Sequence, residues 1–352
     1  ATTSPNPCRL HAFNPKIISH RCLLHRNYGG YYEKIFICCL LFVMVAYTSL
    51  PVLGVTRNMS DESTDTLSLT TNEDRYARHE TMIAEAQELG GSTNEYDAYL
   101  ELKSCDSDEL TDRGYTKEEI AAIHSSTLEG KMLAEVFRRA TLDDETLTNM
   151  GYNTQEISQL RALTGDETLA EVAPFALASV TCYNTITSHT YSNSYDKTYL
   201  LADFGWEWDK MPVIKRTDTI GCGWSEDYYP DNSVGDNVVT NVYRQLNGAP
   251  NTKEVDTGLY EKQLETAEHQ FEMQPTLAGI EYWCESGYGT MTLSQAGLDN
   301  NAKFSFKYAH DTMGITPFVS APWGIGFSFD HAEDIFTPAA GVAYSDFADI
   351  IE

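Results

Sequence analysis

The pattern of hydrophobic and polar positions changes along the 352-residue chain. An apolar run at 34–54 is followed by a polar stretch at 55–72, by helical periodicity over 73–172 and by alternating apolar residues over 174–352. Helical periodicity followed by alternation predicts a segregated α+β fold. We expect a small all-α helical repeat region and then an antiparallel β-sandwich or barrel-like domain.

The helical region contains an internal repeat. CDSDELTDRGYTKEEIAAI at 105–123 recurs as LDDETLTNMGYNTQEISQL at 142–160. Each copy predicts a short helix, a Gly-Tyr turn and a second helix that starts with a capping box. The residues expected to cap the short helix, to end it and to form the capping box are Ser107, Gly114, Thr116 and Glu119 in the first copy and Asp144, Gly151, Asn153 and Glu156 in the second.

The turn of the second copy, Met150-Gly151-Tyr152, resembles the loop of ubiquitin-associated domains. The first copy has Arg113 in place of the methionine, and an exported protein would meet no ubiquitin. We interpret the likeness as convergent capping chemistry, and it implies no function here.

Short alternating runs bounded by turn residues dominate the second half of the chain and predict strands. These runs cover 179–192, 197–208, 218–225, 237–246, 278–286, 289–295, 303–310 and 324–330. Residues 259–272 fit either a helix or a long strand. Many short strands with no long helix between them predict an antiparallel sandwich or barrel.

The apolar run at 34–54 predicts export. Basic residues precede it and acidic residues follow it, which favours a cytoplasmic N-terminal side. Its densest part has the length of a signal-peptide core, and Val52-Leu53-Gly54 would suit cleavage; an uncleaved membrane anchor is the alternative. We expect residues 1–33 to be a disordered leader or upstream sequence and 55–72 to be a flexible tether.

Charge separates the N-terminal part from the rest. Residues 1–57 hold six basic residues and one acid, so subtracting their +5 from the net −28 leaves −33 on the remainder. A body this acidic repels phosphate backbones, which argues against nucleic-acid partners. Acidity suits a soluble secreted protein, such as one from a Gram-positive bacterium.

Four cysteines follow the export segment. Cys105 occupies the repeat position of Leu142, which predicts a small buried hydrophobe. The other three, Cys182, Cys222 and Cys284, permit one disulfide or none, with Cys222–Cys284 the first pair to test. The sequence favours no obligatory disulfide, and the absence of a C-x-x-C pattern argues against a zinc knuckle.

The segment 204–212 carries one candidate site. Alternation places Glu207 and Asp209 on one strand face and Trp206 and Trp208 on the other. An acid pair beside aromatic residues could serve glycoside hydrolysis or sugar stacking. A solvated face opposite a core face explains the same pattern.

A second candidate combines histidines and acids late in the β-region. His310 and Asp311, together with His331, could act in hydrolysis or hold a divalent metal if a hairpin joined them. No spacing typical of a metal motif supports their convergence.

A third candidate lies in the loop at 225–237. Asp227, Asp231 and Asp236 offer hard oxygen ligands, so calcium is the one cofactor the sequence suggests. The ordered spacing of a calcium loop is absent, and an ordinary turn-rich loop fits equally. The neighbouring aromatic residues Trp224, Tyr228 and Tyr229 complete the set of candidate ligand-binding residues.

These features favour a non-catalytic role for an exported or surface-tethered protein. We expect it to bind an extracellular carbohydrate or protein, or to act in adhesion or structure, and to meet the membrane only through residues 35–56. Two other classes stay open: an extracellular glycoside-type hydrolase that uses carboxylates of the β-region, and a β-rich toxin or pore-former.

Overall fold

The computed structural model describes most of the chain after residue 71, and the described residues fall within one compact unit that covers 65–352. The predicted leader, the export segment and nearly all of the tether lie outside the described residues. No helix of the described part has the length and hydropathy that would span a membrane. The described ranges are 72–112, 115–225, 227–233, 237–263, 265–311, 318–320, 328–330, 334–336, 342–345 and 349–351.

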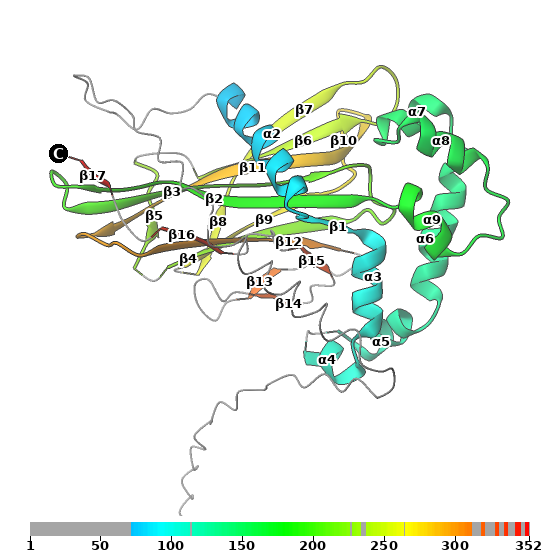
Figure 1. Ribbon diagram of the computed structural model, residues 1–352, viewed down its shortest axis with the longest axis horizontal. Coiled ribbons are helices and arrows are strands. Elements are labelled where there is room, and N and C mark those ends of the chain that lie inside the picture. Colours follow the sequence, from blue (N-terminus) through cyan, green and yellow to red (C-terminus); the bar gives the residue numbers. More distant parts are fainter. Residues whose placement is uncertain are drawn as a thin grey trace, which may run out of the picture. The chain divides into compact units, whose positions relative to one another are not determined.

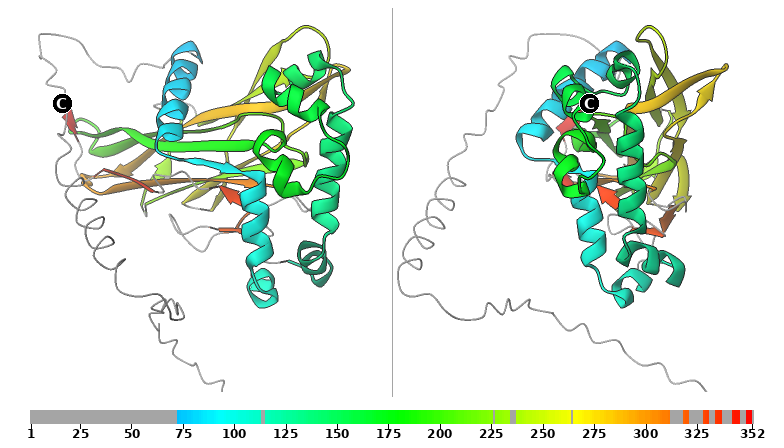
Figure 2. Two further views of the ribbon diagram at one scale, coloured as in Figure 1. Left: turned by 45° about the vertical axis from the view of Figure 1, so that its right-hand side comes forward. Right: turned by 90° about the vertical axis from the view of Figure 1, so that its right-hand side faces the viewer.

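Helices form most of the chain between residues 72 and 176. Helix α2 lies across one face of the larger sheet, and the helices after it gather at one end of the strands (Figures 1 and 2). The helices are α2 (Asn72–Glu88), α3 (Glu95–Ser104), α4 (Ser107–Asp112), α5 (Lys117–His124), α6 (Thr127–Arg139), α7 (Asp144–Asn149), α8 (Thr154–Arg161) and α9 (Leu169–Ala176).

The larger sheet has the central order β1-β2-β3-β11-β6-β7, with β5 and β10 on β11 and β17 on β2. All of its pairings are antiparallel except that of β17 with β2. The strands are β1 (Ser92–Asn94), β2 (Ser179–Ser192), β3 (Lys197–Trp208), β5 (Tyr229–Pro230), β6 (Val238–Gln245), β7 (Thr252–Gly258), β10 (Thr276–Leu277), β11 (Ile280–Ala296) and β17 (Asp349–Ile351).

The smaller sheet has the order β15-β12-β4-β9-β8, with β16 also on β12. A separate hairpin pairs β13 with β14. These strands are β4 (Thr217–Trp224), β8 (Tyr260–Gln263), β9 (Thr266–Glu272), β12 (Ala302–His310), β13 (Phe318–Ser320), β14 (Ser328–Asp330), β15 (Asp334–Phe336) and β16 (Val342–Ser345). Helices together with mainly antiparallel sheets confirm the α+β class, while the segregated helical repeat region and the sandwich or barrel stay predictions.

Aromatic side chains of the two sheets pack against each other. The rings of Phe204 on β3 and Phe306 on β12 stack with centroids 5.1 Å apart, and those of Trp206 and Phe271 also lie 5.1 Å apart. All four side chains are buried. Because aromatic residues remove large apolar areas from water, these contacts hold the inner faces of β3, β9 and β12 together.

One strand prediction is wrong, and one assignment that the sequence left open is decided. The pattern predicts separate strands at 278–286 and 289–295, but both runs belong to the single strand β11. Gly287, between the two runs, leaves room for Trp206 of the neighbouring strand, and Gly289, the first residue of the second run, leaves room for Phe204 of the same strand, so neither glycine makes a turn. Residues 259–272, whose pattern fits helix or strand, contain β8 and β9.

The helix starts in the two repeat copies differ from the prediction by one residue. Ser107 and Asp144 are the first residues of α4 and α7 rather than their caps. The carboxylate of Asp143 accepts a hydrogen bond from the Thr146 N–H. In the first copy, the carboxylate of Asp106 accepts hydrogen bonds from the N–H groups of Asp108 and Glu109. The expected capping boxes, which pair Thr116 with Glu119 and Asn153 with Glu156, are present.

The two copies contribute to different cores. Leu110, Tyr115 and Ile120 of the first copy form a small cluster that includes Cys105. Leu147 and Tyr152 of the second copy belong to the main core, together with residues of both sheets. The helical residues therefore share a core with the strands, while the division of the chain at residues 73–172 and 174–352 stays a prediction.

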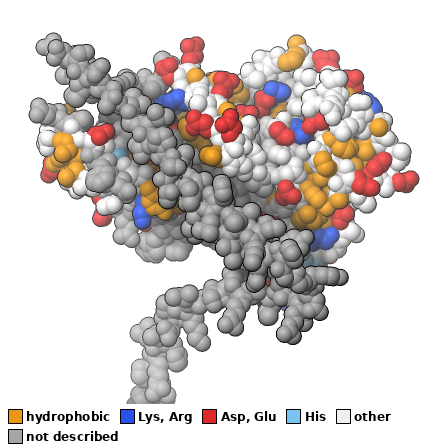
Figure 3. Space-filling view, in the orientation of Figure 1, with side chains coloured by type: hydrophobic (Ala, Val, Ile, Leu, Met, Phe, Trp, Pro, Cys, Tyr) orange, Lys and Arg blue, Asp and Glu red, His pale blue; other side chains and the backbone are white. Residues whose placement is uncertain are grey.

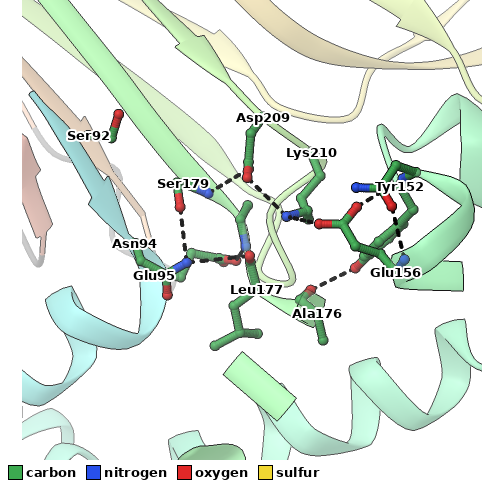
Figure 4. A network of polar contacts seen from close by, with 12 residues as sticks. Ser92, Asn94, Glu95, Tyr152, Glu156, Ala176, Leu177, Ser179, Asp209 and Lys210 are labelled. Carbon is green, nitrogen blue, oxygen red and sulfur yellow. Dashed lines mark hydrogen bonds and ion pairs between the residues drawn. The ribbon is translucent and has the colours of Figure 1, made fainter. Parts of the chain in front are cut away.

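A polar network joins the helices to the sheet (Figure 4). Lys210, which follows Asp209 just beyond the end of β3, is almost fully buried, and its Nζ atom lies 2.9 Å from carboxylates of both Glu156 and Asp209. Asp209 in turn accepts a hydrogen bond from the Ser179 N–H at 2.7 Å. Because a buried ammonium needs paired charge, this network fixes α8 against the ends of β2 and β3.

Candidate functional site

Helix α2 is attached to the outer face of the larger sheet by a few side chains. Ile83 and Ala86 pack against Tyr183 of β2 in a small apolar cluster. The His79 ring is fully buried, and its centroid lies 5.3 Å from that of Tyr288 on β11. A side chain at Gly205 would come within 2.9 Å of His79 Nδ1, so the glycine makes room for the histidine.

A groove of 590 Å³ lies between α2 and the sheet. Helix α2 forms one wall, and strands β3, β6, β7 and β11 form the floor and the other wall. On the face drawn in Figure 3, acidic side chains are more frequent than basic ones. The lining residues are Tyr76, Glu80, Ile83, Ala84, Gln87, Glu207, Val242, Arg244, Thr252, Glu254, Glu285 and Ser286.

Arg244, the basic residue of the groove lining, is already paired. Its Nε atom donates to a Glu285 oxygen at 2.9 Å, and its Nη2 atom lies 2.5 Å from the other oxygen. Strand β11 has a bulge relative to β6 between Cys284 and Ser286, so Glu285 is the extra residue. A bulge re-aims a side chain, and here the re-aimed carboxylate meets the arginine. The other three lining glutamates, Glu80, Glu207 and Glu254, have no arginine or lysine partner among the described residues of the groove wall.

The pKa shifts of two groups in the groove, Tyr76 and Glu285, indicate a negative electrostatic potential. Partial burial raises the pKa of the Tyr76 hydroxyl, and the charges of Glu80, Glu207 and Glu285 raise it further. Burial also raises the pKa of Glu285; Arg244 opposes this shift and Glu207 adds to it. A negative charge raises the pKa of a neighbouring acid, so these shifts indicate that the carboxylates lie close enough to interact within the groove. The arrangement is suited to a cation.

The two acids expected together on β3 lie in different places. Glu207 lines the groove, with one carboxylate oxygen 3.7 Å from the Nε2 atom of His79. Asp209 lies in the polar network with Ser179 and Lys210 instead. The structure therefore does not bring Glu207 and Asp209 into one site. Glu207 instead lines the groove together with glutamates from other strands.

Most of the candidate aromatic residues lie in the interior. The side chains of Trp206, Trp208, Trp224 and Tyr228 have at most 1% of their surface exposed. The Trp224 indole N–H donates to the Tyr228 carbonyl at 2.9 Å. Tyr229 is 49% exposed and lies on the short strand β5.

His310 and Asp311 are buried at the end of β12. The His310 Nδ1 atom lies 2.9 Å from a carboxylate oxygen of Asp218, and the Asp311 N–H donates to Asp218 at 3.2 Å. Tyr308 donates a hydrogen bond to the same carboxylate. A buried charge held by several donors is typical of a structural cluster. His331 lies outside the described residues.

The proposed calcium ligands are only partly described, since Asp236 lies outside the described residues. Asp231 accepts hydrogen bonds from Ser233 and Ser294. Partial burial raises its pKa, but these bonds and Lys197 outweigh burial and lower the pKa to about 2. Asp227 has a φ of 71°. Within the described ranges, no group of three or more His, Cys, Asp or Glu residues is placed to hold a metal ion. The calcium site stays a prediction.

The four cysteines after the export segment are buried thiols. Cys105 lies in the small core of the first repeat copy, as its repeat position predicts. Burial raises the thiol pKa of Cys182, Cys222 and Cys284, which keeps them protonated and unreactive as nucleophiles.

No protein-family model matches the chain, and no curated protein matches it. Among solved structures, a pore-forming protein is 8% identical over 38% of this chain and 79% of its own, with a TM-score of 0.20. The collagen-binding domain of Erysipelothrix rhusiopathiae surface protein RspB is 9% identical over 48% of this chain and 47% of its own, with a TM-score of 0.22. The KRT10-binding region of the pneumococcal serine-rich repeat protein PsrP is 13% identical over 44% and 97%, with a TM-score of 0.18. Likeness at these TM-scores carries no argument about function.

Proposed function

We propose that the protein is a non-catalytic binding protein, exported or tethered at the cell surface, and that the groove under α2 takes a cationic segment of a protein ligand. The observation that carries this proposal is the lining of the groove: four glutamates face one arginine, and that arginine is paired with Glu285. A lysine or arginine side chain would restore the balance of charge.

The tyrosine of the groove supports the same ligand class. Tyr76 is 37% exposed and lies on α2 beside Glu80 and Glu207, whose charges act on its hydroxyl. Aromatic faces attract ammonium and guanidinium groups, and nearby carboxylates strengthen that attraction.

The test is binding of a fluorescein-labelled octalysine peptide to the full-length chain, followed by fluorescence anisotropy. Glu207→Gln and Glu254→Gln should each weaken binding about fivefold, since a partly desolvated charge pair is worth roughly 1 kcal/mol. Glu118→Gln changes the net charge equally, but Glu118 is exposed on α5 and outside the groove lining, so binding should be unchanged. Equal weakening by all three variants would show nonspecific attraction and would refute the groove as the site.

The export part of the proposal rests on residues 34–54 and their flanking charges. Expression of the full chain in a Gram-positive host, followed by cell fractionation, tests it. We expect the protein in the medium or the membrane fraction, and recovery of the intact chain from the cytosol would refute export.

One observation favours a second candidate, a glycoside-type hydrolase. Glu285 and Glu207 line the same groove, and the charge of Glu207 contributes to the raised pKa of Glu285; two carboxyl groups beside one space is the arrangement such enzymes use. Hydrolysis of a panel of nitrophenyl glycosides that is abolished by both Glu207→Gln and Glu285→Gln would support this alternative. Hydrolysis that survives both substitutions, or none with any glycoside, would reject it.

A further inference from the structure

Strand β7 is the outer strand of the larger sheet. It pairs with β6 along its whole length, from Arg244 opposite Thr252 to Val238 opposite Gly258. No other strand of the described residues pairs with it. Most of its side chains are exposed, and Figure 1 shows it at the margin of the sheet beside α2.

Two hydrogen bonds fix which residues of β7 face β6. The Gln245 N–H donates to the Asn251 carbonyl at 2.8 Å, and the Leu259 N–H donates to the Asn237 carbonyl at 3.2 Å. In an antiparallel ladder, residues alternate between bonding inward and bonding outward. Odd-numbered residues of β7 therefore bond to β6. The residues whose N–H and C=O groups point to the outer edge are Thr252, Glu254, Asp256 and Gly258.

The same alternation places side chains on the groove face. Thr252 and Glu254 both line the groove. Asp256 lies on the same face, where its carboxylate accepts a hydrogen bond from the Thr240 hydroxyl at 2.7 Å. The residues that offer outward backbone groups are thus the residues that carry acidic side chains on the groove face.

We propose that the cationic segment binds as an added antiparallel β-strand along the outer edge of β7, with Lys or Arg at every second position on the groove face. This inference rests on the proposed function and specifies the conformation of its ligand. Backbone hydrogen bonds to an exposed edge supply affinity, and alternate side chains supply specificity. Acidic residues at the edge favour a basic strand and disfavour pairing with a second copy of this acidic chain.

The register of the added strand determines which backbone N–H groups of the ligand bond to β7. In an antiparallel pair, directly opposed residues share a face and, at hydrogen-bonded positions, exchange both backbone bonds. The ligand residues with side chains on the groove face are therefore the ones whose N–H groups point at β7. In a peptide of alternating lysine and valine, the lysine N–H groups make the bonds and the valine N–H groups point away.

The experiment uses the full-length chain and three labelled peptides of alternating lysine and valine. One is unmodified, one is N-methylated at the lysine amides and one at the valine amides. We expect lysine-amide methylation to weaken binding at least about tenfold, because several backbone bonds are lost. Valine-amide methylation, which adds the same groups at the outward positions, should weaken it less than about threefold.

A protein variant tests the same edge. Thr252→Pro removes an outward N–H and leaves the bonds to β6 in place, and an edge strand tolerates proline at such a position. Thr252→Pro should weaken binding of the unmodified peptide about fivefold or more. Thr252→Val, which keeps the N–H, should leave binding unchanged. Since the peptides test the register on the unaltered chain, misfolding of the proline variant would not decide the question.

The outcomes separate the two proposals. Equal binding of both methylated peptides, with Glu254→Gln still weakening the unmodified peptide, would overturn the added strand and leave the cationic groove standing. No binding of the unmodified peptide while octalysine still binds would overturn the added strand alone, and no binding of either peptide to the wild-type chain would overturn both.

Discussion

The Nη1 atom of Arg139 lies 2.9 Å from the hydroxyl oxygen of Tyr152, and both side chains are buried. The same guanidinium donates to the carbonyls of Met211 at 2.6 Å and Pro212 at 2.5 Å. Tyr152 in turn donates to the Ala176 carbonyl at 2.7 Å (Figure 4). Helices α6 and α9 are thereby tied to the segment that follows β3.

Tyr152→Phe should destabilise the protein by about 1–3 kcal/mol, because it leaves the buried Ala176 carbonyl without this donor and Arg139 without this acceptor. The measurement is urea unfolding at pH 7. Tyr195→Phe is the matched control, since Tyr195 is 74% exposed and its hydroxyl loss should change stability by less than about 0.5 kcal/mol. Equal stability of the two variants would contradict a structural role for the Tyr152 hydroxyl.

Glu135 predicts a pH dependence of folding. Partial burial raises its pKa, but the hydrogen bond from Arg138 and the charges of Arg139 and Lys215 outweigh burial and lower the pKa to about 2. Because the folded pKa lies below the unfolded one, the contribution is complete above about pH 4.5 and is lost as the pH falls toward 2.

The contribution is at most about 3.5 kcal/mol, from the size of that shift. Glu135→Gln should therefore be less stable than wild type at pH 7, with the gap closing between pH 4.5 and 2 in urea unfolding. Glu118→Gln, an exposed acid on α5, serves as the control and should keep the wild-type pH profile. A gap of constant size across this range would rule out the ionised Glu135 as its source.

Gly151 and Gly130 should respond to alanine in opposite directions. Gly151 has a φ of 92°, and a side chain there would approach the Lys210 Cα atom to 2.7 Å, so Gly151→Ala should destabilise by about 2–3 kcal/mol. Gly130 lies in α6, where a Cβ atom would have nothing within 4 Å among the described residues, so Gly130→Ala should stabilise by about 0.5–1 kcal/mol. Thermal unfolding of both variants decides the sign, and a stable Gly151→Ala protein would contradict the close contact.

Local patterns predict much of the fold. The alternation in 179–192 and 197–208 gives β2 and β3 with the same bounds, because a strand with one buried face repeats every two residues. The capping boxes at Thr116 and Asn153 also follow from residues three positions apart. Where the prediction fails, at Gly287 and Gly289, the glycines accommodate neighbouring rings, which depends on contacts distant in sequence.

The groove cannot be predicted in the same way. Glu207 is a candidate from its strand pattern, but Tyr76 and Glu80 come from a helix more distant in the chain, and only the docking of α2 brings them together. Glu285 lies at a bulge, where the alternation that predicts the direction of a side chain fails. A charged residue inside an otherwise buried strand is the available signal for Glu285.

Arg244→Gln should strengthen binding of the octalysine peptide. The substitution removes the paired cation from the groove and releases Glu285, so four carboxylates then face the ligand. A partly exposed ion pair is worth up to about 1 kcal/mol, which predicts a gain of about threefold to fivefold in affinity. The gain should shrink as salt is raised, because screening weakens exposed charges. Lys131→Gln makes the same change in net charge at an exposed position of α6 and should leave affinity unchanged. Arg244→Gln could instead weaken binding of the peptide as much as Glu254→Gln does. That result would show that the arginine stabilises the structure of the groove and that the ligand does not compete with it for Glu285.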